Sequence, residues 1–292
     1  MAGAPSQHRL GIALVVAAAV AFSTAPFFTR LLAYDSWTIL FWRGLFGGGL
    51  IAAIMVLLQG RAGLRELVGM TRSGWLVTLY STLAMIAFIP SLQLTSVSNV
   101  AIIIATGPFL AAGLAWMWVR EIPRSRTIWA SVVALCGVAI IVGYAQLGSD
   151  MLGIGLACVM ALAIAAMTVM ARRHRDTSMV AAAAISNFLG SVVSIPFAHG
   201  ITSVTGGDLV ILAMFGFFQV ALGLTMFLLG SRLLPSGQAA LISTLETPLM
   251  PFWIWLAFAE VPGLRVLLGG ALVMGAVIAD IVGDSSEEKP AG

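Results

Sequence analysis

The chain has 292 residues, of which 60% are hydrophobic and only 9% are charged. An ordinary soluble domain has about 25% charged residues, so this chain lacks the polar surface that a soluble fold of its size needs. The composition therefore predicts an integral membrane protein. The net charge of +3 does not indicate nucleic-acid binding, because the basic residues are scattered in short segments between apolar ones.

Apolar segments long enough to cross a bilayer as helices recur along the whole chain. A spanning helix needs about 20 apolar residues, and the segments here are continuously apolar where barrel strands would alternate. The first segment is long enough to be a retained helix and not a cleaved signal peptide. The ten expected spans cover residues 10–32, 36–58, 73–94, 98–119, 126–143, 152–171, 178–197, 209–231, 236–258 and 263–282.

The basic residues indicate how these spans are oriented. If the N-terminal segment 1–9 is cytoplasmic, Arg30 and Arg265 lie outside and Arg43 lies within a span, and all other basic residues fall on the cytoplasmic side. The positive-inside rule expects such a bias. We therefore predict that both the N-terminus and the tail 284–292 are cytoplasmic. The polar end of the chain, "GDSSEEKPAG", is typical of a disordered segment.

The two halves of the chain resemble one another at an offset of about 140 residues. The stretch "GIALVVAAAVAFSTAPFFTR" (11–30) resembles "GIGLACVMALAIAAMTVMAR" (153–172). The sequence thus predicts two five-helix repeats, 10–143 and 152–283. Because five is an odd number, the repeats must be inverted relative to one another in the membrane, as in many secondary transporters, whose substrate sites lie where the repeats meet.

A second pair of matching stretches separates shared residues from unshared ones. "ATGPFLAAGLAWMWVREIPR" (105–124) matches "TLETPLMPFWIWLAFAEVPG" (244–263). Pro108 falls on Pro248 and Glu121 on Glu260, so we assign these four residues to the architecture. Glu246 is not shared, since Thr106 stands at its counterpart position.

Glu246 is the first candidate for a functional residue. It lies about ten residues, or ~15 Å, into its helix. An ionised side chain at mid-bilayer costs ~2.5–3.5 kcal/mol, so Glu246 is expected to face a polar cavity, to be paired or to be protonated. A purely structural pair or a neutral acid bonded to a neighbouring helix is the alternative.

Arg43, in "FWRGLFGGG" (41–49), is the other charge inside a span. It lies ~10 Å from the outer end, so its head can snorkel to the surface. The alternative is that Arg43 faces the outer mouth of a cavity and attracts a carboxylate, either that of a substrate or that of Glu246.

Uncharged polar and aromatic side chains within the spans extend the candidate site. The polar ones are Ser23, Thr24, Tyr80, Thr106, Asn187 and Gln219, and the aromatic ones include Trp42, Phe88 and Phe217. Interhelical hydrogen bonding is the ordinary explanation for such polar residues. Their distribution over the first, third, fourth, seventh and eighth spans also favours a shared polar interior, and the aromatic rings would suit a large apolar side chain.

The fifth and tenth spans contain few polar groups and many small residues. Ala271 and Gly275, like Gly44 and Gly48 in the second span, have the four-residue spacing that permits close helix packing. We interpret the fifth and tenth spans as a scaffold, with a homodimer contact as a further possibility.

Several classes of protein find no support in the sequence. There is no GxxxxGK[ST] loop for an ATP-driven pump and no HExxH motif, and the three histidines lie outside the spans. No Ser–His or Cys–His nucleophile is apparent. We therefore expect a protein that is not an enzyme and that needs no cofactor or metal.

The segments "GPFLAAGLAWMWVREIPRSRTIWASVVALCGVAIIVG" (107–143) and "TPLMPFWIWLAFAEVPGLRVLLGGALVMGAVIADIVG" (247–283) give the chain a family resemblance. It resembles the ten-helix EamA-type members of the drug/metabolite transporter superfamily, and Arg43 also looks family-like. Phe22 departs from the pattern, because Trp often stands there. The resemblance implies that spans 1–4 and 6–9 surround a cavity, with the fifth and tenth peripheral.

Within the superfamily the chain looks most like bacterial exporters of aromatic and other hydrophobic amino acids. The resemblance implies an alternating-access exporter of bulky neutral amino acids in the bacterial inner membrane. Another metabolite or a cationic drug bound by Glu246 is an alternative substrate, and a membrane enzyme or assembly component is an alternative class. Proton coupling through Glu246 and downhill transport both remain open.

Overall fold

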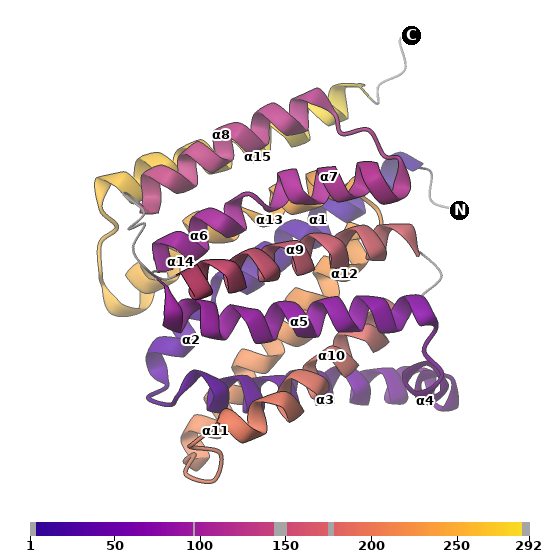
Figure 1. Cartoon of the computed structure of the whole chain (residues 1–292), viewed down its shortest axis with the longest axis vertical. Coiled ribbons are helices and arrows are strands. Elements are labelled where there is room, and N and C mark those ends of the chain that lie inside the picture. Colours follow the sequence, from indigo (N-terminus) through magenta and orange to yellow (C-terminus); the bar gives the residue numbers. More distant parts are fainter. Residues whose placement is uncertain (1–3, 96, 143–150, 175–177, 288–292) are drawn as a thin grey trace.

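The computed structural model describes residues 4–95, 97–142, 151–174 and 178–287, and all regular structure in these ranges is helical (Figure 1). Each of the ten predicted spans is occupied by one helix or by consecutive helices. The first half contains α1 (Ala4–Ser23) with α2 (Ala25–Leu31), α3 (Ser36–Gln59), α5 (Arg72–Leu94), α6 (Val97–Ala105) with α7 (Gly107–Val119), and α8 (Ser125–Val142). The second half contains α9 (Met151–Arg173), α10 (Met179–Ser194) with η1 (Ile195–Phe197), α11 (Gly206–Phe215) with η2 (Gly216–Leu224) and α12 (Thr225–Ser231), α13 (Ser236–Ser243) with α14 (Glu246–Phe258), and α15 (Leu264–Glu287).

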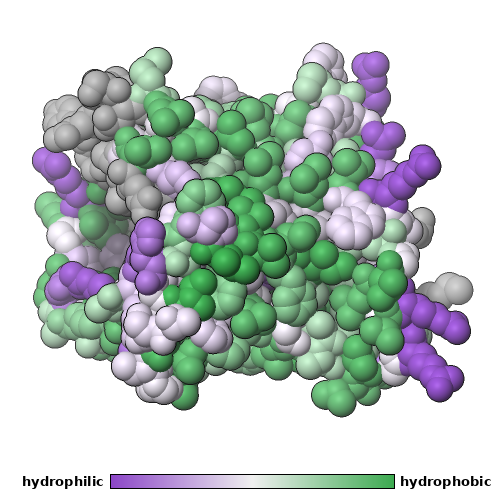
Figure 2. Space-filling view, turned by 60° about the horizontal axis from the view of Figure 1, so that its bottom comes forward, coloured by the Kyte–Doolittle hydropathy of each residue, from purple (hydrophilic) through white to green (hydrophobic). Residues whose placement is uncertain are grey.

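The hydropathy of the molecule is that of a membrane protein. Seven of the spans are long and apolar enough to cross a bilayer by length and composition, and α7 and most of α8 are shorter apolar helices. Figure 2 shows hydrophobic residues over the middle of the visible face and strongly hydrophilic residues at its two ends. The predicted all-α membrane fold of ten spans is thereby confirmed. We call the side where α1 begins and α15 ends the terminal side (right in Figure 1), and the opposite side the far side.

Eight spans pack around a closed circuit in which the two halves of the chain alternate. The order of neighbours is first, eighth, second, seventh, third, sixth, fourth and ninth, and the ninth packs again on the first. Every step of this circuit therefore joins a span of one repeat to a span of the other. Consecutive spans of one repeat are not neighbours in the circuit, so the repeats are interleaved and not side by side.

The fifth and tenth spans, α8 and α15, lie together outside the circuit (Figure 1). Their backbones meet at two glycines: a Cβ atom on Gly269 would lie 2.4 Å from the carbonyl oxygen of Gly137. Close contact of small residues is a common way for helices to associate in lipid. Ala271 is exposed, and a Cβ on Gly275 would meet nothing within 4 Å; both residues line an open groove between α8 and α15.

The hydrophobic core is continuous towards the terminal side and divided towards the far side. One cluster of buried residues takes members from all ten spans, among them Met55, Met170 and Leu241. Towards the far side, one cluster joins the first, second and eighth spans around Phe28, and a separate cluster joins the third, fourth and sixth around Met160. The helix α14 has no fully buried residue. Apolar packing thus holds the spans together most completely on the terminal side.

Two segments differ from the expectation drawn from the sequence. Residues of the expected loop after the second span form the helix α4 (Arg61–Val68), in which Leu67 packs on the core while Leu64 and Val68 are exposed. Such an amphipathic helix is typical of a membrane surface. The helix α15 continues to Glu287, within the tail that was expected to be disordered, because extending a formed helix adds a hydrogen bond per residue. Residues 288–292 lie outside the described residues.

Candidate functional site

Three spans are interrupted inside the membrane segment, each beside a proline. The breaks precede Pro26, Pro108 and Pro248, and proline both lacks an N–H and clashes with the preceding turn. At each break a threonine hydroxyl donates a hydrogen bond of 2.6 Å to the carbonyl oxygen three residues earlier: Thr24 to Ala21, Thr106 to Ile103 and Thr244 to Leu241. The hydroxyls of Thr24 and Thr106, predicted to bind substrate, therefore satisfy backbone groups in this structure.

The break in the ninth span explains how a carboxylate can lie in an apolar segment. Glu246 is the first residue of α14, and the N-terminus of a helix carries unsatisfied N–H groups and a partial positive charge. The helices α7 and α14 each have 13 residues. Aligning their first residues sets Glu246 against Gly107 and Pro108 against Thr247, each one residue from the pairing suggested by the sequence. The interruption thus creates an electrostatically favourable position for one carboxylate.

Glu246 is partly exposed, and it has no hydrogen bond or ion pair to any of the residues that the structure describes. The pairing with Arg43 that was one expectation is not formed. Trp253 lies seven residues later, two helical turns along the same face of α14. The indole N–H of Trp253 donates a hydrogen bond of 2.7 Å to Ser23 Oγ, which places this face of α14 against the break in the first span.

Arg43 belongs to the second span, α3, and its side chain contacts the eighth span. Its Nη1 donates a hydrogen bond to Gln219 Oε1, and its guanidinium carbon lies 5.4 Å from the centre of the Phe215 ring. Gln219 Nε2 donates in turn to the carbonyl oxygen of Phe22, at 3.3 Å. Arg43, Gln219 and Phe22 therefore connect three spans, and Phe22 is adjacent to Ser23, the acceptor of the Trp253 hydrogen bond. Arg43 Nε is buried and has no hydrogen-bond partner among the described residues.

Close backbone packing and an unusual helix hold Arg43 and Gln219 in position. A Cβ on Gly47 would lie 2.4 Å from Val220 Cβ, and a Cβ on Gly216 would lie 2.7 Å from the carbonyl oxygen of Arg43. The segment η2 that contains Gln219 is a π-helix, a form that occurs frequently at functional sites. The glycines let α3 and η2 approach, and the wider winding sets the direction of Gln219.

Asn187, in α10, is the most deeply buried of the predicted site residues after Ser23. Its Nδ2 donates to the carbonyl oxygen of Ala183, at 2.9 Å, and its Oδ1 is buried without a partner among the described residues. Gly44 and Gly48 allow α3 to press on this helix: a Cβ on Gly44 would lie 2.8 Å from the carbonyl oxygen of Asn187. The expected packing role of these glycines is observed.

None of the remaining predicted residues forms a hydrogen bond with this group within the described part of the chain, although Trp42 packs on the same cluster as Phe215, and Phe217 contacts the Phe218 ring. Trp42 donates its indole N–H to the carbonyl oxygen of Ile201 in a far-side loop, at 3.2 Å. Tyr80 packs on the terminal-side core. Phe88 and Phe217 are exposed, at 36% and 37%. These four residues lie in helices of the expected spans, but sequence reasoning could not tell which of the predicted side chains meet.

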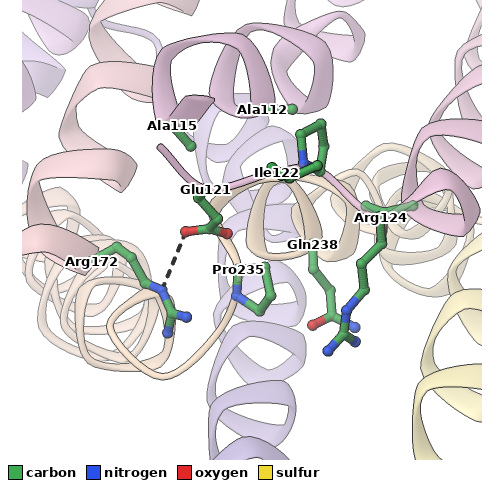
Figure 3. Close-up of a pocket in the computed structure, with 11 residues that line it drawn as sticks. Ala112, Ala115, Glu121, Ile122, Arg124, Arg172, Pro235 and Gln238 are labelled. Carbon is green, nitrogen blue, oxygen red and sulfur yellow. Dashed lines mark ion pairs between the residues drawn. The ribbon is translucent and has the colours of Figure 1, made fainter. Parts of the chain in front are cut away.

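Sequence reasoning missed a polar group on the terminal side, of which Figure 3 labels Gln238. Asp280 in α15 is 2% exposed and accepts hydrogen bonds from Thr127 Oγ1, at 2.9 Å, and from Gln238 Nε2, at 3.1 Å. Thr127 and Gln238 also line a cavity of about 220 Å³ next to Glu121. Sequence reasoning noted few polar groups in the tenth span and passed over Asp280 near its terminal-side end, although the aspartate itself was the available signal.

The residues assigned to the architecture lie in packed or paired positions. Pro108 is buried, and Pro248 lies 3.1 Å from where a Cβ on Gly270 would stand. Glu121 forms an ion pair with Arg172, and Glu260 forms one with Arg30.

These features define a multi-pass helical membrane protein whose interleaved repeats enclose charged and polar side chains. The chain matches the EamA-like transporter family over residues 9–143 and again over residues 151–279. It belongs to that family, and so to a class of membrane transporters of small molecules. A solved structure described as "Crystal structure of protein" shares the fold, with a TM-score of 0.81 and 14% identity, over 96% of this chain and 99% of that chain. The comparison with curated proteins gave no match.

Proposed function

We propose that this protein is an alternating-access secondary transporter that exports aromatic and other bulky neutral amino acids across the bacterial inner membrane. The observation that carries the proposal is the position of Arg43. A guanidinium within a membrane span, aligned by Gln219 and Phe215, is a suitable ligand for a substrate carboxylate. The buried Nε, without a partner in the described residues, is a donor that such a carboxylate would satisfy.

Glu246 and the surrounding aromatic residues supply the other parts of the proposed site. A carboxylate at the start of α14 can bind the substrate ammonium group or carry a coupled proton. Trp253 presents a large amphipathic ring on the same face, with its N–H held by Ser23. Of the remaining predicted residues, Asn187 has an open acceptor, and we assign Trp42, Tyr80, Phe88 and Phe217 to the walls.

The distribution of packing supports alternating access. The core is continuous on the terminal side and divided on the far side. The terminal side is assigned to the cytoplasm because most of the arginines lie in its loops and helix ends. The structure then corresponds to a conformation closed to the cytoplasm. To open the protein to the cytoplasm, the repeats proposed here, 10–143 and 152–283, would exchange conformations.

Flux in proteoliposomes tests the proposal. Uptake of tryptophan should be saturable and competed by phenylalanine and tyrosine, but not by organic cations. Arg43→Gln should reduce transport of tryptophan by on the order of tenfold or more and transport of tryptophanamide, which lacks the carboxylate, far less. Arg265→Gln removes a far-side arginine outside the site and is the matched control. Equal loss for both substrates in Arg43→Gln would refute the role of Arg43.

The carboxylate of Glu246, unpaired within the described residues, favours a second candidate function, the export of organic cations. A cation flanked by aromatic rings would satisfy this carboxylate. Cation uptake that Glu246→Gln abolishes, without any tryptophan flux, would establish this alternative. If tryptophan is transported, the same variant tests coupling: loss of the response to a pH gradient indicates proton coupling, and an unchanged response excludes Glu246 as the coupling group.

The exposed face of α15 is the surface that we propose for a homodimer. Ala271 and Gly275 lie on it and would permit close approach of a second copy. Replacing Gly275 by Leu should then shift the protein to the monomer in light-scattering measurements in detergent. A mass that is unchanged by this substitution would exclude this face as the contact.

A further inference from the structure

Within the described residues, an ion pair connects the repeats on each side of the molecule. On the terminal side, Arg172 Nε lies 3.6 Å from Glu121 Oε2 (Figure 3). On the far side, Arg30 Nη1 lies 2.7 Å from Glu260 Oε1. The terminal-side pair joins the sixth span to the end of the fourth, and the far-side pair joins the first span to the end of the ninth.

These two pairs are copies of each other under the internal repeat. Arg30 and Arg172 are the last residues of the matching stretches 11–30 and 153–172, and Glu121 corresponds to Glu260. The backbone repeats as well: Arg120 and Ala259, which directly precede the two glutamates, both have left-handed conformations, with φ of 58° and 57°. In each pair, an arginine that ends the first span of one repeat meets a glutamate that follows the fourth span of the other repeat.

The copies differ in their surroundings. The side chains of Glu121 and Arg172 are each 22% exposed. Both also form hydrogen bonds at the connection between α12 and α13, Glu121 with the first residue of α13 and Arg172 with the residue that follows α12. Glu121 Oε1 accepts a hydrogen bond from the backbone N–H of Ser236, and Arg172 Nη1 donates to the carbonyl oxygen of Arg232, each at 3.2 Å. The terminal-side pair thus also holds the connection between the eighth and ninth spans.

The far-side pair is open to its surroundings. The side chains of Arg30 and Glu260 are 46% and 56% exposed. Arg30 also lies over the Phe258 ring, whose centre is 5.3 Å from its guanidinium carbon. The side chains of this pair make no further hydrogen bond within the described residues. The difference in exposure between the two pairs agrees with the hydrophobic core, which is continuous on the terminal side and divided on the far side.

We infer that the two ion pairs are reciprocal latches that set which side of the transporter is closed. In the conformation described here, Glu121–Arg172 is the more enclosed of the two pairs and holds the terminal side shut. Inverted repeats can exchange conformations. In the exchanged state Arg30–Glu260 is the enclosed pair, and Glu121–Arg172 is the exposed one. The inference rests on the alternating access proposed above, but it requires no particular substrate.

The physical basis is the dependence of an ion pair on its environment. An exposed pair contributes little, because water and salt screen it, whereas removing one partner of an enclosed pair leaves an uncompensated charge. Each pair therefore stabilises mainly the conformation in which it is enclosed. Neutralising Glu121 should disfavour the conformation closed on the terminal side, and neutralising Glu260 should disfavour the exchanged one. The two substitutions should act in opposite directions.

Distances between spin labels in proteoliposomes, without substrate, provide the test. The background replaces the native Cys136 and Cys158 by Ala. One labelled pair, Leu152→Cys and Val210→Cys, reports on the far side, and another, Leu64→Cys and Met117→Cys, reports on the terminal side. All four positions are exposed, and none belongs to an ion pair in the described structure.

We expect Glu121→Gln to lengthen the terminal-side distance and shorten the far-side distance, with the population ratio changing on the order of tenfold. Glu260→Gln should shift the ratio the other way. Glu66→Gln, an exposed terminal-side glutamate in α4, is the matched control and should leave both distributions unchanged. The exchange Glu121→Arg with Arg172→Glu should move the ratio back towards the original value, because it reforms the ion pair but not the hydrogen bonds to Ser236 and Arg232, and this partial restoration separates latching from misfolding.

Unchanged distances in Glu121→Gln, or a shift in the same direction for Glu121→Gln and Glu260→Gln, would overturn the inference. Its failure is distinguishable from failure of the proposed substrate class. Opposite shifts together with no tryptophan flux would support the latches and exclude amino acid export. Tryptophan flux with unchanged distances would support amino acid export and exclude the latches.

Discussion

Arg120 and Ala259 share a left-handed backbone conformation at positions related by the internal repeat. They are the two residues other than glycine with positive φ in the described ranges. Each ends the helix of an equivalent span, α7 or α14, and its backbone N–H bonds to a carbonyl oxygen of the preceding turns. An L-residue in this conformation costs roughly 1–2 kcal/mol, and glycine does not incur this penalty. The same strained turn therefore directs Glu121 and Glu260 in both halves.

Ala259→Gly should stabilise the protein. Glycine adopts φ near 57° without the steric penalty of a Cβ, so we expect a gain of about 0.5–1 kcal/mol, measured by thermal unfolding in detergent. Ala257→Gly, the same substitution two residues earlier within α14, is the control and should destabilise by about the same amount. Destabilisation by Ala259→Gly would show that the left-handed turn is not strained.

Gly47→Ala should disturb the position of Arg43. The added Cβ would lie 2.4 Å from Val220 Cβ, so α3 and η2 would have to separate. We expect a loss of about 1–3 kcal/mol in unfolding free energy, together with reduced transport. Gly49→Ala is the control: its Cβ would meet only Phe188 Cζ, at 4.0 Å, and it should be tolerated. Equal effects of the two substitutions would argue against the close contact of α3 with η2.

Gln219→Glu should separate the structural role of Arg43 from its proposed role in binding. A glutamate at this position would keep a partner for the guanidinium, so stability should be retained, but it would neutralise the charge that is proposed to bind substrate. Gln219→Leu should instead cost about 1.5–3 kcal/mol, because it removes a hydrogen bond to a charged group. Thermal unfolding and tryptophan flux measure both effects. Full transport by Gln219→Glu would exclude Arg43 as the carboxylate ligand.

Asp280→Ala should destabilise the terminal side. It removes the acceptor of two buried hydrogen bonds, from Thr127 and Gln238, and leaves these donors in a low-dielectric environment. We expect a loss of about 1–3 kcal/mol in thermal unfolding. Thr127→Val, which removes only one of the two donors, should cost less. If Asp280→Ala has no effect on the unfolding temperature, the hydrogen bonds to Asp280 do not contribute to stability.

Much of the chain's architecture follows from local sequence. Hydropathy summed over about 20 residues locates a span because each span meets lipid as a separate helix. The helix α4 was not predicted because it has only eight residues and its apolar side chains lie on one face. Its summed hydropathy is therefore as low as that of a polar loop. The prolines beside the breaks were visible as well, but a proline does not by itself say which side chain will satisfy the freed carbonyl.

The contacts of the candidate site were not predictable in the same way. Gln219 lies 176 residues from Arg43, and its direction depends on a π-helical segment and on glycines in two helices. The sequence marked both residues as unusual in lipid. It suggested Glu246 as a partner for Arg43 because the sequence indicates only how deep in the membrane a residue of a helix lies, and these two depths are similar. Rotation of each helix about its axis decides such contacts, and that rotation depends on packing with neighbouring spans.

By itself, the sequence determined the ten spans and the inverted repeat, and it predicts their orientation under the positive-inside rule, because hydrophobic length and charge are properties of each segment alone. Only the tertiary structure decided that Arg43 meets Gln219, that Glu246 begins an interrupted helix, and that Arg172 and Arg30 reach the glutamates of the opposite repeat. These contacts depend on how interleaved helices pack. The free energy of that packing is shared among residues far apart in the chain.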